Sequence, residues 1–79
     1  MKTIEKDDTI PIMDYVKADV LTAGQLMVDD LIRVADEVVS ITEIISLSDG
    51  YTLEIINDFG ERELIQVGEY EQFDLMILQ

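Results

Sequence analysis

The strongest constraint on the fold is a run of short β-forming segments from Asp29 to Asp58, separated by residues that favour turns. The segments are rich in valine, isoleucine, leucine and tyrosine, and the breaks fall at Ala35-Asp36 and at Ser48-Asp49-Gly50. Closely spaced strands with tight turns between them are typical of small antiparallel all-β domains. A chain of 79 residues, 48% of them hydrophobic, is sufficient for one such domain with a single core.

The alternation of apolar and polar residues predicts a small five-stranded antiparallel barrel in residues 17–79. A partly flexible N-terminal extension is expected in residues 1–16, and its residues 10–13 are expected to pack on the barrel. The longest strand is expected over residues 37–47. The apolar parity changes within this strand, which predicts a bulge near Thr42-Glu43 that bends it and helps to close the barrel.

Two connections have a distinct expected geometry. Residues 24–30 are predicted to form a loop with one helical turn that places Leu26 and Val28 in the core. A turn is predicted at residues 58–60, where Gly60 is free to take a positive φ.

The C-terminal residues 73–78 are apolar on both faces of the predicted last strand. Phe73, Leu75 and Ile77 fall on one face, and Met76 and Leu78 fall on the other. We expect this strand at an edge of the sheet, where its second apolar face needs a cover. Either the N-terminal segment or a second copy of the chain would supply that cover, so a homo-oligomer joined through this strand is one prediction.

A helix over residues 23–45 is the main alternative, because apolar residues also recur there at helical spacing. These residues are Leu26, Leu31, Val34, Val38, Ile41 and Ile45. The β-branched residues in the second half of the segment favour a strand by up to about 1 kcal/mol. The all-β interpretation is therefore preferred.

The absence of cysteine and histidine excludes several kinds of chemistry. Without these residues the chain has no disulfide, thiolate nucleophile, imidazole base or zinc site with nitrogen or sulfur ligands. Asp29, Asp30, Asp36 and Glu37 are expected near one hairpin end, but their spacing is not that of a calcium-binding loop. We therefore predict that the protein is not an enzyme and holds no metal or cofactor.

Charge gives the clearest indication of a partner. The chain has 18 acidic and 5 basic residues, a net charge of -13. Nucleic acids and anionic membranes bind basic faces, so direct binding to either is not expected, whereas a protein with a basic surface fits. The predicted contact residues are acidic, with one aromatic at a turn tip: Asp29, Asp30, Asp36, Glu37, Phe59, Glu61, Glu63, Glu69, Glu71 and Asp74.

The N-terminal residues interleave charges with apolar side chains. They contain no continuous hydrophobic segment of the kind found in signal peptides or membrane anchors. A cytoplasmic location is therefore expected.

Residues 26–44, LMVDDLIRVADEVVSITEI, resemble the opening of the SH3-like barrels of translation-factor KOW and elongation-factor-P-type modules. Those modules have a leucine, two spacers, Gly-Asp, a short apolar strand, a tight turn and a second apolar strand. Asp29 stands where the family has glycine, and residues 50–67 are similar to the next hairpin of the family. The resemblance implies an SH3-like barrel but no specific activity, because such barrels host many functions. The chain is also similar in style to uncharacterised bacteriophage proteins.

Three functions follow as predictions. The first is a non-catalytic protein-interaction module, for example a phage or mobile-element accessory protein. The second is an acidic inhibitor that mimics nucleic acid and occludes a basic nucleic-acid-binding protein, with an affinity that falls steeply as salt rises. The third is the subunit of a structural homo-oligomer.

Overall fold

The computed structural model describes residues 15–78, which form six antiparallel strands in one sheet. The strands are β1 (Tyr15–Thr22), β2 (Leu31–Val34), β3 (Glu37–Leu47), β4 (Gly50–Ile56), β5 (Arg62–Gly68) and β6 (Gln72–Leu78), and a 3₁₀ turn, η3 (Ala23–Gln25), follows β1. Strands make up 69% of the described residues, which confirms the all-β prediction. The helical alternative for residues 23–45 is wrong, because β2 and β3 occupy most of that range.

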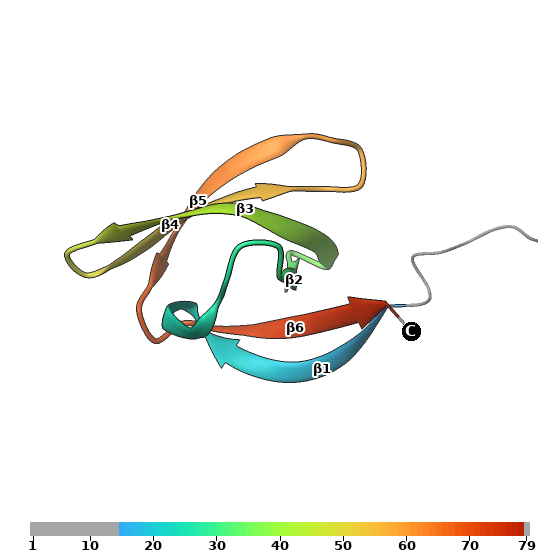
Figure 1. The fold of residues 1–79 in the computed structure, drawn as a ribbon, viewed down its shortest axis with the longest axis horizontal. Helices are drawn as coiled ribbons and strands as arrows, with labels where there is room; N and C mark the ends of the chain where they lie inside the picture. The colour runs from blue at the N-terminus through green and yellow to red at the C-terminus, as the bar shows by residue number, and fades with distance from the viewer. Residues whose placement is uncertain (1–14, 79) are drawn as a thin grey trace, which may run out of the picture.

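The strand order in the sheet is β1-β6-β2-β3-β4-β5. Figure 1 shows β1 and β6 on one side of the molecule and β3, β4 and β5 on the other. The outer strands β1 and β5 do not pair with each other, so the sheet is open between them. The sheet has one strand more than predicted and is not closed, so the five-stranded barrel is not confirmed.

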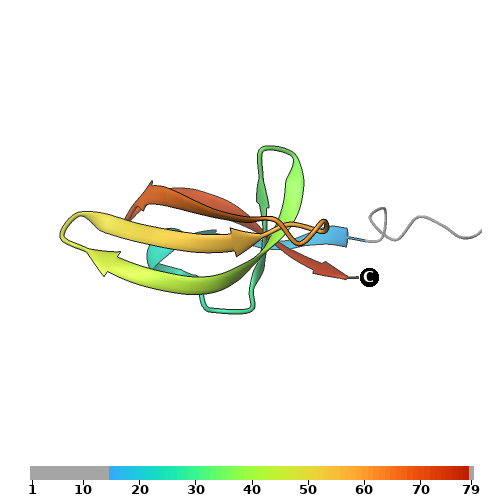
Figure 2. The ribbon, with the colours of Figure 1, turned by 90° about the horizontal axis from the view of Figure 1, so that it is seen from above.

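Strand β3 joins the two halves of the sheet. Its residues 37–40 pair with β2, and its residues from Ser40 to Leu47 pair with β4. The register shifts between Ile41 and Glu43, so Thr42 is an extra residue opposite β4, as the predicted bulge requires. The bulge bends the strand, and Figure 2 shows the curvature of β3 from above. The inner faces of the two halves can therefore enclose one core.

The core is made of apolar residues from β2 to β6 and from the segment after β1: Ala23, Leu26, Ile32, Val39, Ile41, Leu53, Ile55, Val67 and Phe73. Of these, Ile32, Ile41 and Leu53 are the largest side chains that are fully buried. Leu53 and Ile55 of β4 are buried, and so is Phe73 of β6.

The predicted core residue Val28 is exposed instead, and so is Ile77, which alternation places on the same face of the last strand as Phe73. Val28 is 49% exposed because it lies at the tip of the loop after η3, where Asp29 has a φ of +79° and turns the chain. Ile77 is 48% exposed because the pairing of β6 with β2 ends at Met76, and Ile77 extends beyond it to face Val16 on β1. Met76, on the other parity, is buried.

The C-terminal strand is not an edge strand. β6 lies between β1 and β2 and pairs with both. The prediction of a homo-oligomer joined through a free edge of this strand therefore loses its premise. Strand β1 begins at Tyr15 and so includes the last two residues of the segment predicted as an N-terminal extension. The predicted packing of residues 10–13 lies outside the described residues.

The Ala35-Asp36 turn is a tight hairpin, as predicted, and it has a measurable cost. Both residues have positive φ angles, 50° and 67°, in the left-handed region that asparagine and glycine adopt more readily. We expect the double change Ala35→Asn and Asp36→Gly to raise the free energy of unfolding by about 1 kcal/mol. Urea unfolding would measure the gain, and Asp49→Asn serves as the control for the lost charge, because Asp49 lies in another turn and has no positive φ. An equal gain from Asp49→Asn alone would contradict the backbone explanation.

Candidate functional site

The β4–β5 turn, residues 57–61, holds an exposed aromatic residue in a defined position. The Asn57 side-chain oxygen accepts hydrogen bonds from the backbone amides of Phe59, at 2.9 Å, and Glu61, at 3.0 Å. The Asn57 side-chain amide donates to Glu61 Oε1 at 2.8 Å. Gly60 has a φ of +79° and donates to the Asn57 carbonyl, as the predicted turn requires. Phe59 is 85% exposed at the tip, as predicted.

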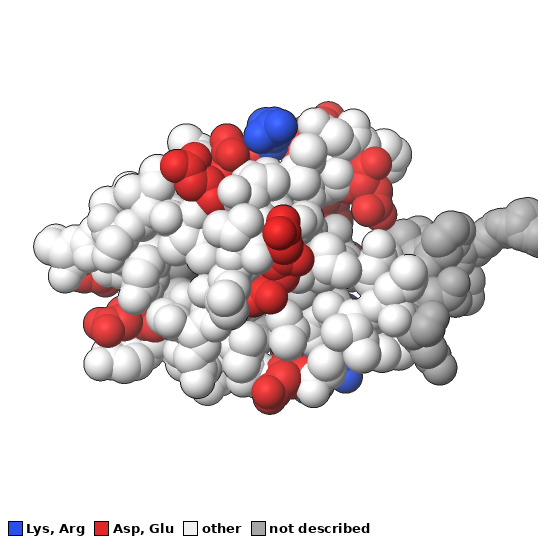
Figure 3. All heavy atoms as spheres, viewed as in Figure 1, with Lys and Arg blue, Asp and Glu red and all other residues white. Residues whose placement is uncertain are grey.

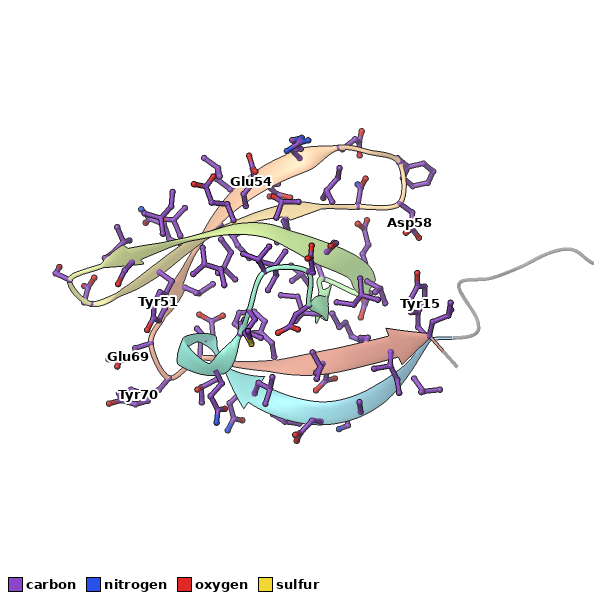
Figure 4. The ribbon with its side chains drawn as sticks, in the orientation of Figure 1. Tyr15, Tyr51, Glu54, Asp58, Glu69 and Tyr70 are labelled. Atoms are coloured by element: carbon purple, nitrogen blue, oxygen red, sulfur yellow. The ribbon has the colours of Figure 1, made fainter. Side chains whose placement is uncertain are left out.

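A cleft of about 400 Å³ lies where this turn approaches the β2–β3 turn and the start of β1. We call it the aromatic cleft. Its apolar lining comes from Tyr15, Val38, Phe59 and Met76, and its charged lining from Arg33, Asp36, Glu37 and Asp58. Figure 4 shows Tyr15 pointing toward the turn that carries Asp58. The cleft therefore combines two aromatic side chains with three carboxylates.

A second recess of about 320 Å³ adjoins the aromatic cleft, because Glu37 and Asn57 line both. We call it the acidic recess. Glu37, Glu61 and Glu63 supply its carboxylates, Arg62 adds one positive charge, and Val39 and Ile55 are the buried core residues beneath it. The aliphatic part of a long side chain can rest on such a floor while its charged end meets the carboxylates. The two hollows together make one acidic end of the sheet.

Arg33 in the aromatic cleft and Arg62 in the acidic recess offset part of the charge of the five carboxylates that line the two hollows. In residues 15–78 the basic residues are Lys17, Arg33 and Arg62. The Arg62 guanidinium lies 3.4 Å from Glu54 Oε1, which also accepts a 2.8 Å hydrogen bond from the Thr42 hydroxyl. An exposed ion pair of this kind contributes little to stability. Figure 3 shows acidic groups spread over the visible face with few basic groups among them.

Half of the predicted contact residues come together at this end. Asp36, Glu37 and Phe59 line the aromatic cleft, and Glu37, Glu61 and Glu63 line the acidic recess. The residues are distant in sequence but lie on turns and strand ends that the pairing of β3 with β2 and β4 brings side by side.

The other predicted contact residues lie elsewhere, and two of them have local roles. The Asp30 carboxylate accepts a 2.8 Å hydrogen bond from the Met27 amide and shapes the loop before β2. The Glu71 carboxylate accepts one of 3.2 Å from the Gly68 amide in the β5–β6 turn. The remaining residues, Asp29, Glu69 and Asp74, line neither hollow.

Several lining residues of the aromatic cleft were not predicted from the sequence: Tyr15, Arg33, Val38, Asn57, Asp58 and Met76. The sequence could have indicated that Arg33 and Val38 lie together, because a two-residue hairpin at Ala35-Asp36 places them opposite each other on β2 and β3. No local pattern indicates that the start of β1 lies beside the β4–β5 turn.

The chain matches no protein-family model, and neither the comparison with curated proteins nor that with solved structures gives a match. Among the residues that the structure describes, no group of three or more acidic side chains is placed to hold a metal ion. Within the same residues, no helix is long and apolar enough to cross a membrane. The candidate site therefore rests on the geometry and charge of this chain.

We expect the stability of the protein to rise with salt, because its 18 acidic residues outnumber 5 basic ones. Carboxylates a few ångströms apart in water repel each other by about 1 kcal/mol, and salt screens this repulsion. Raising NaCl from about 20 mM to about 500 mM should therefore raise the free energy of unfolding by about 1–2 kcal/mol. The double variant Glu61→Gln and Glu63→Gln should show a weaker dependence. An unchanged or falling urea midpoint in the original chain would contradict the expectation.

Proposed function

We propose that this protein is a non-catalytic interaction module that binds the basic surface of a protein partner with the acidic end of its sheet. The observation that carries the proposal is the convergence of an exposed, hydrogen-bonded turn carrying Phe59 with carboxylates on both sides of it. Because the turn is already ordered, Phe59 loses little conformational freedom when it contacts a partner. An aromatic residue of this kind is a common anchor of protein interfaces.

The chemistry of the aromatic cleft favours a cationic side chain. Tyr15 and Phe59 offer aromatic faces, which attract lysine and arginine by up to about 2 kcal/mol where water is excluded. The three carboxylates of Asp36, Glu37 and Asp58 outnumber the one guanidinium group, that of Arg33, around the same space. The net charge of -13 also attracts a basic partner to the protein at long range. The same charge repels nucleic acid from the protein.

Capture of a partner from native host lysate at low salt tests the proposal, with Phe59→Ala as the variant and Tyr70→Ala as its matched control. Tyr70 is 79% exposed and lies between Glu69 and Glu71, at the opposite end of β5 from Phe59. We expect a basic protein that is released by about 500 mM NaCl. Phe59→Ala should weaken its retention about tenfold, and Tyr70→Ala should leave it unchanged. Equal losses with both variants, or a partner that resists salt, would contradict the proposal.

The acidic inhibitor that mimics nucleic acid is a second candidate. It is favoured by the presence of carboxylates at both ends of β5, at Glu61 and Glu63 and again at Glu69 and Glu71. A seven-residue strand separates these groups by about 20 Å, a spacing over which a nucleic-acid-binding groove could contact both. The double variant Glu69→Gln and Glu71→Gln decides between the candidates: it should weaken capture by a mimic and leave the interaction module unaffected.

We also infer that the sheet is an SH3-like barrel that is open between β1 and β5. The bent strand β3, which pairs with β2 along one half and with β4 along the other, supports this inference. So does the core enclosed between the two halves. The φ of +79° at Asp29, the position where the resembled family has glycine, agrees with the same inference.

A further inference from the structure

The outer edge of β5 presents backbone groups that no strand uses among residues 15–78, because β5 pairs with β4 alone. Figure 1 shows β5 along the outside of the sheet, with β4 beside it. The Asn57 amide donates to the Glu61 carbonyl at 3.0 Å, so Asn57 and Glu61 are a hydrogen-bonded pair of the β4–β5 ladder. In an antiparallel pair only every second residue bonds inward, so the amides and carbonyls of Arg62, Leu64 and Gln66 point outward.

The other outer strand of the sheet is protected and β5 is not. β1 has a bulge between Lys17 and Asp19, and these two charged residues flank it. A bulge of this kind hinders the pairing of a further strand. Charged residues do not distinguish the two edges, because β5 carries Arg62 and Glu63. β5 pairs with β4 in continuous register from Arg62 to Gly68, without a bulge or proline, and its Leu64 side chain is 64% exposed. The edge of β5 is therefore suited to accept another strand.

The acidic recess lies beside this edge. Glu63 is on β5 itself, on the same face as the half-buried Ile65 and the buried Val67, and its carboxylate lines the recess. A strand added to β5 would direct alternate side chains toward this face. A lysine or arginine there could lay its aliphatic stem over Val39 and Ile55 and bring its charge to the surrounding carboxylates.

We propose that β5 is a strand-addition site for an extended, basic segment of the protein partner, with lysine or arginine at alternate positions. This inference rests on the function proposed above and specifies how the partner binds. Charge complementarity selects this occupant over a second copy of the chain, because two copies would each bring a net charge of -13 to the interface. The hydrogen bonds of the added strand supply affinity, and the acidic recess supplies the preference for basic side chains.

The test uses end-blocked peptides of about nine residues, a common strand length, that alternate lysine with threonine. Two further versions carry N-methyl groups on either the odd or the even backbone amides. In an added strand only one of these two sets of amides faces β5. The peptide methylated on the other set should bind like the unmodified peptide, and the peptide methylated on the set that faces β5 should bind at least about tenfold more weakly. Binding by charge alone makes no such distinction. Titration calorimetry with the full chain measures all three.

Amide hydrogen exchange gives a second readout on the protein. The unmodified peptide should slow exchange of the Leu64 and Gln66 amides, which face outward in the free protein. Leu64→Pro removes one outward amide that the sheet does not use, and should weaken binding about tenfold, whereas Leu64→Ala keeps the amide and should retain most of it. If Leu64→Ala weakens binding as much as Leu64→Pro does, the loss in binding comes from the side chain and not from the amide.

Each other outcome is informative. Equal, salt-sensitive binding of both methylated versions overturns strand addition and leaves the proposed function standing. Failure of every peptide to bind also overturns strand addition, and the Phe59→Ala capture experiment then decides the proposed function independently. A concentration-dependent dimer that protects the Leu64 amide without peptide would assign the edge to a second copy and overturn the proposal.

Discussion

Replacing Ile41 with alanine is expected to lower the free energy of unfolding by about 2–5 kcal/mol. Ile41 is fully buried at the centre of β3, opposite Ile55, and belongs to the single core of the sheet. Its backbone is also bonded on the β2 side, where its amide donates to the Asp30 carbonyl at 3.0 Å and its carbonyl accepts from the Asp29 amide at 2.8 Å. The surrounding chain therefore has little freedom to close the cavity that alanine would leave.

A domain of this length is expected to have a total stability of about 4–12 kcal/mol, so such a loss is a large part of it. Urea unfolding followed by far-ultraviolet circular dichroism measures the change. Ile45→Ala is the matched control, since it makes the same chemical change on the same strand at a side chain that is 44% exposed. We expect it to cost less than about 1 kcal/mol. A similar loss for the two variants would contradict the placement of Ile41 in the core.

Those parts of the fold that depend on local patterns were predicted correctly. The bounds of β3, the bulge at Thr42, the positive φ of Gly60 and the exposure of Phe59 all follow from alternation and turn chemistry over a few residues. These features need no information about which distant segments meet.

The features that depend on distant pairing were not predicted. The place of β6 between β1 and β2 changes a supposed edge strand into an interior one. The end of its pairing with β2 exposes Ile77 and leaves Met76 buried. In each case the alternation of the strand was visible in the sequence, but which neighbour covers which face was not.

The same division holds for the candidate site. Acidic turns were visible as isolated sequence features, and the fold gathers Asp36, Glu37, Phe59, Glu61 and Glu63 at one end of the sheet. Asp30 and Glu71 show the opposite case, since each accepts a hydrogen bond from a backbone amide of its own loop. Acidic residues of turns commonly have this local role, and composition alone does not separate the two.

Gly50→Ala is expected to be the most damaging of the glycine substitutions, with a loss of about 1–3 kcal/mol or more. Gly50 is buried at the start of β4, and a Cβ added there would overlap the Val67 carbonyl oxygen on β5. That oxygen belongs to the backbone of the β4–β5 ladder, so the conflict cannot be relieved by turning a side chain. The two strands would have to move apart where Gly50 pairs with Gly68.

Gly68→Ala is the matched control, because Gly68 lies directly opposite Gly50 and a Cβ there would meet no atom within 4 Å. We expect this variant to change the free energy of unfolding by less than about 0.5 kcal/mol. Urea unfolding of both variants, together with amide exchange along β4 and β5, measures the difference. Because the two glycines are paired, both changes add one methyl group to the same rung of the ladder, and only the space around each differs. Equal stabilities would mean that β4 and β5 do not have this register, and the outward amides assigned to β5 would then have to be assigned anew.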